Sequence, residues 1–427
     1  MMRVLWFTNI PMPAVDRRTG RSTAGSGHWM SQLLLALRSV PELELGVATA
    51  YPSLPDLQFD EDGVEYFVVG QGRLASHFGC SRSDLLACRD VVERFDPDLV
   101  HVHGSERFFG LLRARGLIDR PTVVSLQGLL SANARDFYGA LSPADRVAAH
   151  RITEVLTGRG LCWERRAFRQ GASREAEVLD GADAVLGRTD WDREQAAAIA
   201  PRTPWHRVGE VLRPEFAAAR WSLARCRRGR VVVTNAGQPR RGLETLLEAA
   251  SVIARRHPGL EIEVAGGVSA RSGYGRLLRR RIDRLAFSGR VRMLGFQDAP
   301  SLARLLAGAH AYVMPSFAEN SSNSLCEAQT VGVPCVAAAA GGTPSLVDDG
   351  RTGLLYPAGD PVALAEQVTR VLSDDLLATR LGSAGRGEAL LRHARRRVVG
   401  ELLSAYRSIL GHGAEGDGVM QGMEMPA

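Results

Sequence analysis

Two glutamates stand on either side of a run of small polar residues. Glu319 precedes the run and Glu327 follows it, and the run itself consists of Asn320, Ser321, Ser322, Asn323 and Ser324. Such residues begin helices, and the first turn of a helix has unpaired N–H groups and a partial positive charge that suit a diphosphate. Glu319 could then accept hydrogen bonds from sugar hydroxyls, while Glu327, deeper in the helix, could reach a ribose diol. The alternative is a polar helix cap with solvated glutamates.

Further polar side chains follow other apolar runs. Residues 98–103 end in His101 and His103, which we expect to face opposite ways if both stay extended, with His103 toward a cleft. A structural histidine is an equal alternative for His103. Arg188 closes the apolar run 182–187, where it could face a phosphate or an acceptor. In a doubly wound sheet, ligands bind outside the carboxyl ends of the strands, so these loops are where chemistry is expected.

The elements that position these loops alternate in type along the chain. Apolar, β-branched runs predict strands at 3–8, 43–48, 64–69, 98–103, 121–126, 182–187, 230–235, 261–265, 291–296, 311–315 and 334–339. Helical spacing predicts helices at 28–38, 83–95, 106–115, 190–199, 243–253, 274–286, 300–308, 323–332 and 360–372. Strands that are apolar throughout and alternate with helices indicate parallel sheets covered on both faces. The predicted fold class is α/β.

The length of the chain indicates two domains. At 427 residues it exceeds one typical core and suits two units of about 200 residues each. We place an N-terminal domain at 1–213 and a C-terminal domain at 214–390. A helix at 391–410 is expected to pack back onto the first domain, and the Gly-rich tail 411–427 is predicted to be disordered.

Composition excludes several classes of protein. Hydrophobic residues make up 45% and charged residues 23%, which is an ordinary globular mixture. No apolar run approaches the ~20 residues that span a bilayer, and the six cysteines show no metal-like pairs, which favours the cytoplasm. All 53 basic residues are arginine, which resembles a coding bias more than a nucleic-acid surface, so we expect no nucleic-acid partner. Runs such as 279–281 leave contact with the inner membrane face as a second hypothesis.

The motifs resemble the signature of the family 4 (group 1) retaining glycosyltransferases, which have the GT-B fold. The two glutamates, the stretch 332–334 (Gly-Val-Pro) and the continuation 341–355 match that signature, and residues 187–192 are similar to one bacterial branch. The resemblance implies two Rossmann-like domains that face each other across a cleft. It also implies transfer of a sugar from a nucleoside-diphosphate sugar to a saccharide or lipid-linked acceptor, with retention at the anomeric carbon.

The same resemblance assigns roles to individual residues. Glu319 contacts the donor sugar, Glu327 holds the ribose, and Arg241 stands where the family places a lysine that neutralises the pyrophosphate; Glu319 and Arg241 are the predicted catalytic residues. The remaining donor-binding residues are the polar run 320–324 with Gly237, Gln238, Gly267, Gly295 and Phe296. The cleft and acceptor side is expected to contain the glycine loop with Gly25, Ser26 and Gly27, together with His103, Gln127 and Arg188.

Three positions depart from the family pattern. Gln127 replaces the usual histidine, the arginine usually found upstream of Arg241 is missing, and Ser345 stands where members often have glutamate. These departures keep open a non-catalytic homologue that serves as a partner subunit. A nucleotide-sugar epimerase of the same fold is a further alternative, which the spacing of the glutamates disfavours.

Cofactors are not expected. The glycine loop at 25–27 is not a Gly-x-Gly-x-x-Gly fingerprint, and no cluster of acidic residues and histidines occurs at metal-ligand spacing, so we predict neither a dinucleotide nor a metal ion. The nucleotide-sugar is then a substrate, and its leaving phosphate is expected to take the acceptor proton. Positive charge for that phosphate would come from Arg241 and helix N–H groups.

Overall fold

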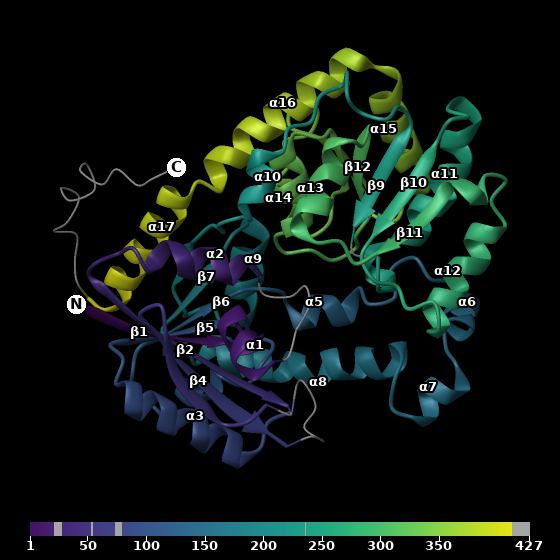
Figure 1. Cartoon of the computed structure of the whole chain (residues 1–427). Coiled ribbons are helices and arrows are strands. Elements are labelled where there is room, and N and C mark those ends of the chain that lie inside the picture. Colours follow the sequence, from purple (N-terminus) through teal and green to yellow (C-terminus); the bar gives the residue numbers. More distant parts are fainter. Residues whose placement is uncertain (21–27, 53, 73–78, 235, 412–427) are drawn as a thin grey trace.

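The chain folds around two separate β-sheets, each flanked by helices (Figure 1). The computed structural model describes residues 1–20, 28–52, 54–72, 79–234 and 236–411. The predicted tail at 411–427 therefore lies outside the described residues except for Gly411. Within the described ranges, no helix is both long and apolar enough to cross a membrane.

The first sheet has eight strands in the order β3-β4-β2-β1-β5-β6-β7-β8. Its strands are β1 (Met2–Thr8), β2 (Leu43–Pro52), β3 (Leu57–Glu61), β4 (Val64–Gln71), β5 (Leu99–His103), β6 (Thr122–Ser125), β7 (Ala184–Gly187) and β8 (Trp205–Arg207). Neighbours pair in parallel, except that β3 and β4 are antiparallel.

The second sheet has six strands, all paired in parallel, in the order β11-β10-β9-β12-β13-β14. Its strands are β9 (Arg230–Thr234), β10 (Glu261–Ala265), β11 (Val291–Gly295), β12 (Ala311–Met314), β13 (Cys335–Ala338) and β14 (Leu354–Tyr356). This is the strand order of nucleotide-binding α/β folds, in which ligands bind where the order reverses. Here the reversal lies between β9 and β12, the two strands that lead to Arg241 and Glu319.

Helices connect the strands in both halves. The first half contains α1 (Pro13–Thr19), α2 (His28–Leu37), α3 (Arg82–Phe95), α4 (Leu111–Ala114), α5 (Leu130–Arg135), α6 (Pro143–Ala148), α7 (Ile152–Leu156), α8 (Leu161–Asp180) and α9 (Asp190–Ile199). The rest of the chain contains α10 (Pro214–Ala218), η1 (Pro239–Arg241), α11 (Leu243–Arg256), α12 (Gly273–Asp283), η2 (Ser288–Arg290), α13 (Ala299–Ala307), α14 (Asn323–Val331), η3 (Thr343–Ser345), α15 (Pro361–Ser373), α16 (Asp375–Arg392) and α17 (Arg395–Ile409).

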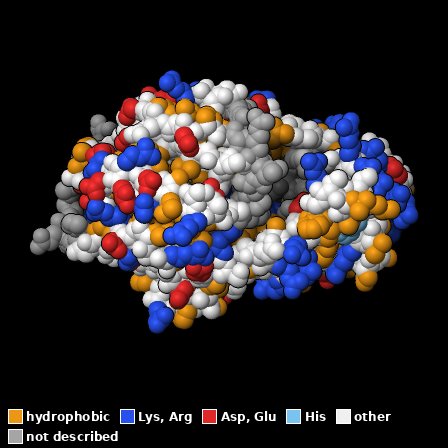
Figure 2. Space-filling model, turned by 90° about the horizontal axis from the view of Figure 1, so that it is seen from below, with side chains coloured by type: hydrophobic (Ala, Val, Ile, Leu, Met, Phe, Trp, Pro, Cys, Tyr) orange, Lys and Arg blue, Asp and Glu red, His pale blue; other side chains and the backbone are white. Residues whose placement is uncertain are grey.

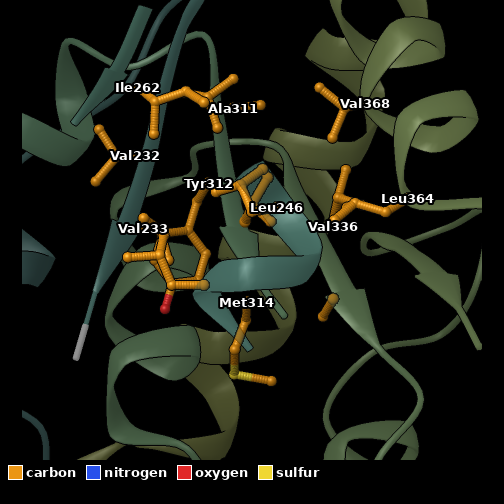
Figure 3. Close-up of a cluster of buried hydrophobic side chains, with 14 of the residues drawn as sticks. Val232, Val233, Leu246, Ile262, Ala311, Tyr312, Met314, Val336, Leu364 and Val368 are labelled. Carbon is orange, nitrogen blue, oxygen red and sulfur yellow. The ribbon is translucent and has the colours of Figure 1, made fainter. Parts of the chain in front are cut away.

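Away from the edge strands, each sheet is buried on both faces, as strands that are apolar throughout require. In the second sheet, side chains of β9, β10, β12 and β13 form one core with Leu246 of α11 and with Leu364 and Val368 of α15 (Figure 3). In the first sheet, Val4 and Trp6 of β1 belong to one buried cluster, while the alternate residues of β1 belong to the cluster on the opposite face.

Several elements differ from the sequence prediction. The strands β3, β8 and β14 were not predicted, because two of them have three residues and β3 alternates exposed and half-buried positions at a sheet edge. The helix predicted at 106–115 is reduced to α4. The polar region 128–180, for which no helix bounds were predicted, contains α8, a helix of 20 residues.

The predicted helix 391–410 is wrong at its start. Residues 391 and 392 belong to α16, and the chain breaks at His393 and Ala394 before α17 begins. In Figure 1, α16 (yellow) lies along the second half and α17 returns to the first sheet. The break lets one segment serve both halves, because each helix can turn its own apolar stripe toward its own sheet.

The return of α17 is fixed by a buried hydroxyl. The Tyr406 Oη atom accepts a hydrogen bond from Trp6 Nε1 at 3.2 Å and lies 2.6 Å from His101 Nδ1. Both partners belong to the first sheet, so Tyr406 joins the end of the chain to its beginning. Val398 and Leu402 of α17 are buried in the same cluster as Trp6.

We therefore expect Tyr406→Phe to destabilise the protein by about 1–3 kcal/mol, because it leaves two buried polar groups without a partner. Tyr356→Phe is the matched control, since the buried Tyr356 hydroxyl has no hydrogen-bond partner within the described residues. Loss of the Tyr356 hydroxyl should leave the free energy of unfolding unchanged or raise it. Urea unfolding of both variants measures the difference, and equal destabilisation would contradict this role of Tyr406.

Candidate active site

A cavity of about 410 Å³ lies between the two halves and is lined by both. Ten of the predicted site residues line it: His103, Gln127, Arg188, Arg241, Glu319, Asn320, Ser321, Ser322, Asn323 and Ser324. The loops after β1, β5, β6 and β7, with residues of α2 and α8, supply the wall from the first half. The loops after β9 and β12 supply the opposite wall, as expected for ligands held at the carboxyl ends of parallel strands.

Arg241 and Glu319 form an ion pair at this wall. Only 17% of the arginine side chain and 10% of the glutamate side chain are exposed, so water screens the pair weakly. Arg240, which also lines the cavity, is held by Gln238 at 2.8 Å, and burial with the nearby charge of Arg241 lowers its pKa to about 9. Two adjacent guanidinium groups with one carboxylate leave an excess of positive charge that a diphosphate could neutralise.

The first turn of α14 faces the same cavity. Ser322 caps the helix, because its hydroxyl accepts a hydrogen bond from the Leu325 N–H group at 3.5 Å. The helix therefore begins at Asn323, as the polar run indicated. Asn323 donates to the Glu210 carboxylate of the first half at 3.0 Å, which ties the start of α14 across the cleft.

Glu327 lies next to this wall but is absent from the cavity lining. Its Oε1 atom accepts hydrogen bonds from Arg213 Nε at 2.9 Å and Nη2 at 2.7 Å. Burial raises the pKa of Glu327 to about 7, against the opposing effect of Arg213. The Oε2 atom of Glu327 makes no hydrogen bond to another residue of the described part of the chain.

Arg188 connects Gln127 to Glu210 within the first half. It donates to the Gln127 Oε1 atom at 3.2 Å and pairs with Glu210 at 3.1 Å. Burial raises the pKa of Glu210, and the charge of Arg188 opposes that rise. Arg188 thus orients the amide that stands where the family has a histidine, and its charge is largely committed to Glu210.

The expectation that His101 and His103 face opposite ways was wrong. Their rings stack with centroids 3.9 Å apart, because residues two apart in a strand point to the same face of the sheet. His101 bonds to Tyr406 and to Ser125, while the buried Nε2 atom of His103 has no partner within the described residues. Burial keeps the pKa of His103 well below its usual value, so the ring is neutral. His103 reaches the cavity, and His101 is structural.

The predicted donor-binding glycines, Gly237, Gly267 and Gly295, lie outside the cavity lining. A Cβ atom at Gly237 would lie 2.8 Å from the Gly267 carbonyl oxygen, and the Gly266 N–H group donates to Gly295 at 2.8 Å. These residues mark the ends of β9, β10 and β11, beside an exposed Phe296. Gln238 instead donates to Glu164 of α8 at 2.9 Å, and so faces the first half.

The remaining predicted residues, Gly25, Ser26 and Gly27, lie outside the described part of the chain. Four residues that sequence reasoning missed contribute to the site: Asn9, Glu106, Arg240 and Glu210. Asn9 Nδ2 donates to the Glu106 carboxylate at 2.6 Å, and both line the cavity. Burial raises the pKa of Glu106 to about 7. No group of three or more possible metal-ligating side chains occurs among residues with described positions.

Comparison with known families agrees with this geometry. Residues 228–374 match the family model described as "Glycosyl transferases group 1", and residues 19–210 match "Glycosyl transferase 4-like domain". The chain belongs to the group 1 glycosyltransferase family. Its resemblance to the family 4 signature is thereby confirmed.

Curated relatives of this glycosyltransferase family member match part of the chain. D-inositol 3-phosphate glycosyltransferases from Mycobacterium bovis and Mycobacterium tuberculosis are 33% identical over 255 residues, which is 56% of this chain and 51% of those proteins. The match thus spans about half the length of these curated relatives.

Solved structures establish the GT-B fold. A sucrose-phosphate synthase from Thermosynechococcus elongatus has a TM-score of 0.71 at 18% identity and covers 97% of this chain and 100% of its own. Anabaena Alr3699/HepE in complex with UDP and glucose has a TM-score of 0.68 at 15% identity, with coverage of 96% and 100%. The predicted arrangement of two Rossmann-like domains across a cleft is confirmed.

The Arg213–Glu327 pair generates a stability prediction. At pH 9, above the raised pKa of Glu327, Arg213→Met should cost about 3 kcal/mol, because it leaves a buried carboxylate without its cation. Adding Glu327→Gln should recover more than half of that loss. Arg397→Met, which breaks the exposed pair with Glu401, is the control and should cost under about 1 kcal/mol. Urea unfolding measures the free energy of unfolding of each variant. A double variant no more stable than Arg213→Met would contradict the coupling between Arg213 and Glu327.

Proposed function

We propose that this protein transfers a glycosyl group from a nucleoside-diphosphate sugar to an acceptor hydroxyl, with retention at the anomeric carbon and without a divalent ion. The observation that carries the proposal is the Arg241–Glu319 pair beside the first turn of α14. Cation, carboxylate and helix N-terminus meet there on one wall of a cleft. Membership of the family supports the same activity.

The donor is proposed to lie along the wall of the second half. Its diphosphate would take the place of Glu319 at Arg241 and accept hydrogen bonds from the N–H groups of α14. Glu319, once released, would turn to the sugar hydroxyls, and the free Oε2 atom of Glu327 would meet the ribose. Because structures of Anabaena Alr3699/HepE contain UDP and UDP-glucose, uridine donors are the first to test.

The proposed reaction needs no further protein base. The bond between the anomeric carbon and the phosphate oxygen breaks, and the acceptor oxygen bonds to that carbon on the same face. The acceptor proton passes to the departing phosphate. Arg241 and the first turn of α14 would stabilise the charge on that phosphate, and contacts that strengthen in the transition state are those that raise the rate.

The acceptor is proposed to lie against the first half, where Asn9, His103, Glu106 and Gln127 line the cavity. These groups can donate and accept hydrogen bonds, which suits the hydroxyls of a saccharide or a lipid-linked glycan. With a pKa of about 7, Glu106 can serve as donor or acceptor near neutrality. We propose the cytoplasm as the place of action, because that is where the composition and the unpaired cysteines fit.

The test compares donor binding and turnover. Of the UDP-, GDP-, ADP- and TDP-sugars, we expect one class to raise the thermal midpoint and to be hydrolysed slowly without acceptor. Arg241→Ala should weaken its binding about 10- to 100-fold, because a charge-assisted contact is lost. Arg380→Ala, an exposed change on α16, should have no effect.

EDTA should leave hydrolysis unchanged, and NMR of the product of transfer should show the anomeric configuration of the donor. Unaltered donor affinity in Arg241→Ala would refute the placement of the diphosphate. Donor binding without hydrolysis or transfer would favour the non-catalytic partner subunit.

A further inference from the structure

The segment between α5 and α8 ends in an apolar projection. Helices α6 and α7 contain no buried residue, and the side chains of Val147, Ile152 and Leu156 are 77–80% exposed. Val155 and Trp163 are each 42% exposed beside them, and the Trp163 indole donates to the Val155 carbonyl at 3.0 Å. We call these five residues the apolar tip. Scattered exposed apolar residues are ordinary, but a cluster of this kind marks an interaction surface.

Exposed arginines surround the apolar tip. They are Arg146, Arg159, Arg166 and Arg169 on the same segment, and Arg271, Arg276, Arg279, Arg280 and Arg284 on or beside α12. None of these nine forms an ion pair with another described residue. Figure 2 shows hydrophobic side chains gathered at the end of the molecule where α6, α7 and α12 lie, with arginines around them.

Two acidic residues of this region already bind other groups of the protein. Asp145 pairs with Arg281 at 2.9 Å, and the Glu154 carboxylate accepts hydrogen bonds from the Arg151 and Gly273 N–H groups. These contacts also hold the projection against α12, so the apolar tip and the arginines of α12 form one surface. That surface has a strong excess of positive charge with an apolar centre.

We infer that the apolar tip and its arginines form a docking surface for an anionic lipid bilayer. Aliphatic side chains and a tryptophan suit the boundary between acyl chains and headgroups, and arginines around them suit lipid phosphates. A nucleic acid would engage the arginines but leave the aliphatic centre unexplained. The surface binds one leaflet and does not span it, since its two exposed helices have six and five residues.

The docking surface lies close to the cleft. Helix α8 begins at the apolar tip, and its Phe168 lines the cavity, so less than two turns of helix separate the two. A bilayer at the tip would therefore lie close to the cleft. This inference rests on the exposed side chains and their charge, and it holds whether or not the proposed transfer reaction is correct.

Vesicle co-sedimentation of the full chain tests the inference. The chain should bind vesicles of equal parts phosphatidylcholine and phosphatidylglycerol, and should bind phosphatidylcholine vesicles about tenfold or more weakly. Ile152→Ser with Leu156→Ser should weaken binding to the mixed vesicles about tenfold or more, because two apolar side chains no longer enter the lipid. Arg279→Gln with Arg280→Gln should weaken it and reduce its dependence on salt.

Two controls are matched to these variants. Leu376→Ser removes a leucine of α16 that is 84% exposed, and Arg380→Gln removes an exposed arginine of the same helix; both should bind vesicles as the parent does. A parental thermal midpoint in each variant shows that it is folded. Equal binding to both kinds of vesicle, or unchanged binding by the apolar-tip variant, would overturn the inference. So would a lipid-free dimer that the apolar-tip variant converts to monomer, because the surface would then join two copies.

Discussion

The site depends on one buried ion pair, between Arg241 and Glu319. The two residues follow β9 and β12, which are sequence-distant but adjacent in the second sheet, at the point where the strand order reverses. Both side chains are largely removed from water, so each requires a partner of opposite charge. In the free chain they satisfy each other. A diphosphate offers Arg241 a second partner, and the exchange would release the carboxylate toward the sugar.

The other half of the cleft is held in place by a second group of charges. Glu210 lies between Arg188 of its own half and Asn323 at the start of α14, so one buried carboxylate fixes both walls. The Ser345 hydroxyl accepts a hydrogen bond from the Asp190 N–H group at 3.2 Å, which gives this departure from the family pattern a contact across the halves. Polar contacts therefore join the two halves at the cleft, and α17 joins them a second time by packing on the first sheet.

The sequence was sufficient for the fold and for one wall of the site. Apolar runs located the long parallel strands, and the polar run before α14 located the helix that faces the cavity. Three residues on the opposite side of the site could not be predicted from the sequence. Asn9, Glu106 and Glu210 belong to the site because of contacts with residues distant in the chain. Arg240 was passed over because only its neighbour matched a family position, although both arginines line the cavity. The apolar tip lies in the region 128–180, for which no helix bounds were predicted, and its exposure cannot be read from short apolar spacing.

The most direct measurement is a double-mutant cycle on nucleotide affinity, measured by calorimetry. The nucleotide is whichever of UDP, GDP and ADP binds the parent chain most tightly. If Glu319 and the diphosphate compete for Arg241, Glu319→Gln should tighten binding of the free nucleotide in the parent chain. The same change should have no effect once Arg241 is alanine, and the difference between the two is the coupling. The account would be contradicted if Glu319→Gln weakened nucleotide binding. It would also be contradicted if Glu319→Gln changed the affinity equally with and without Arg241.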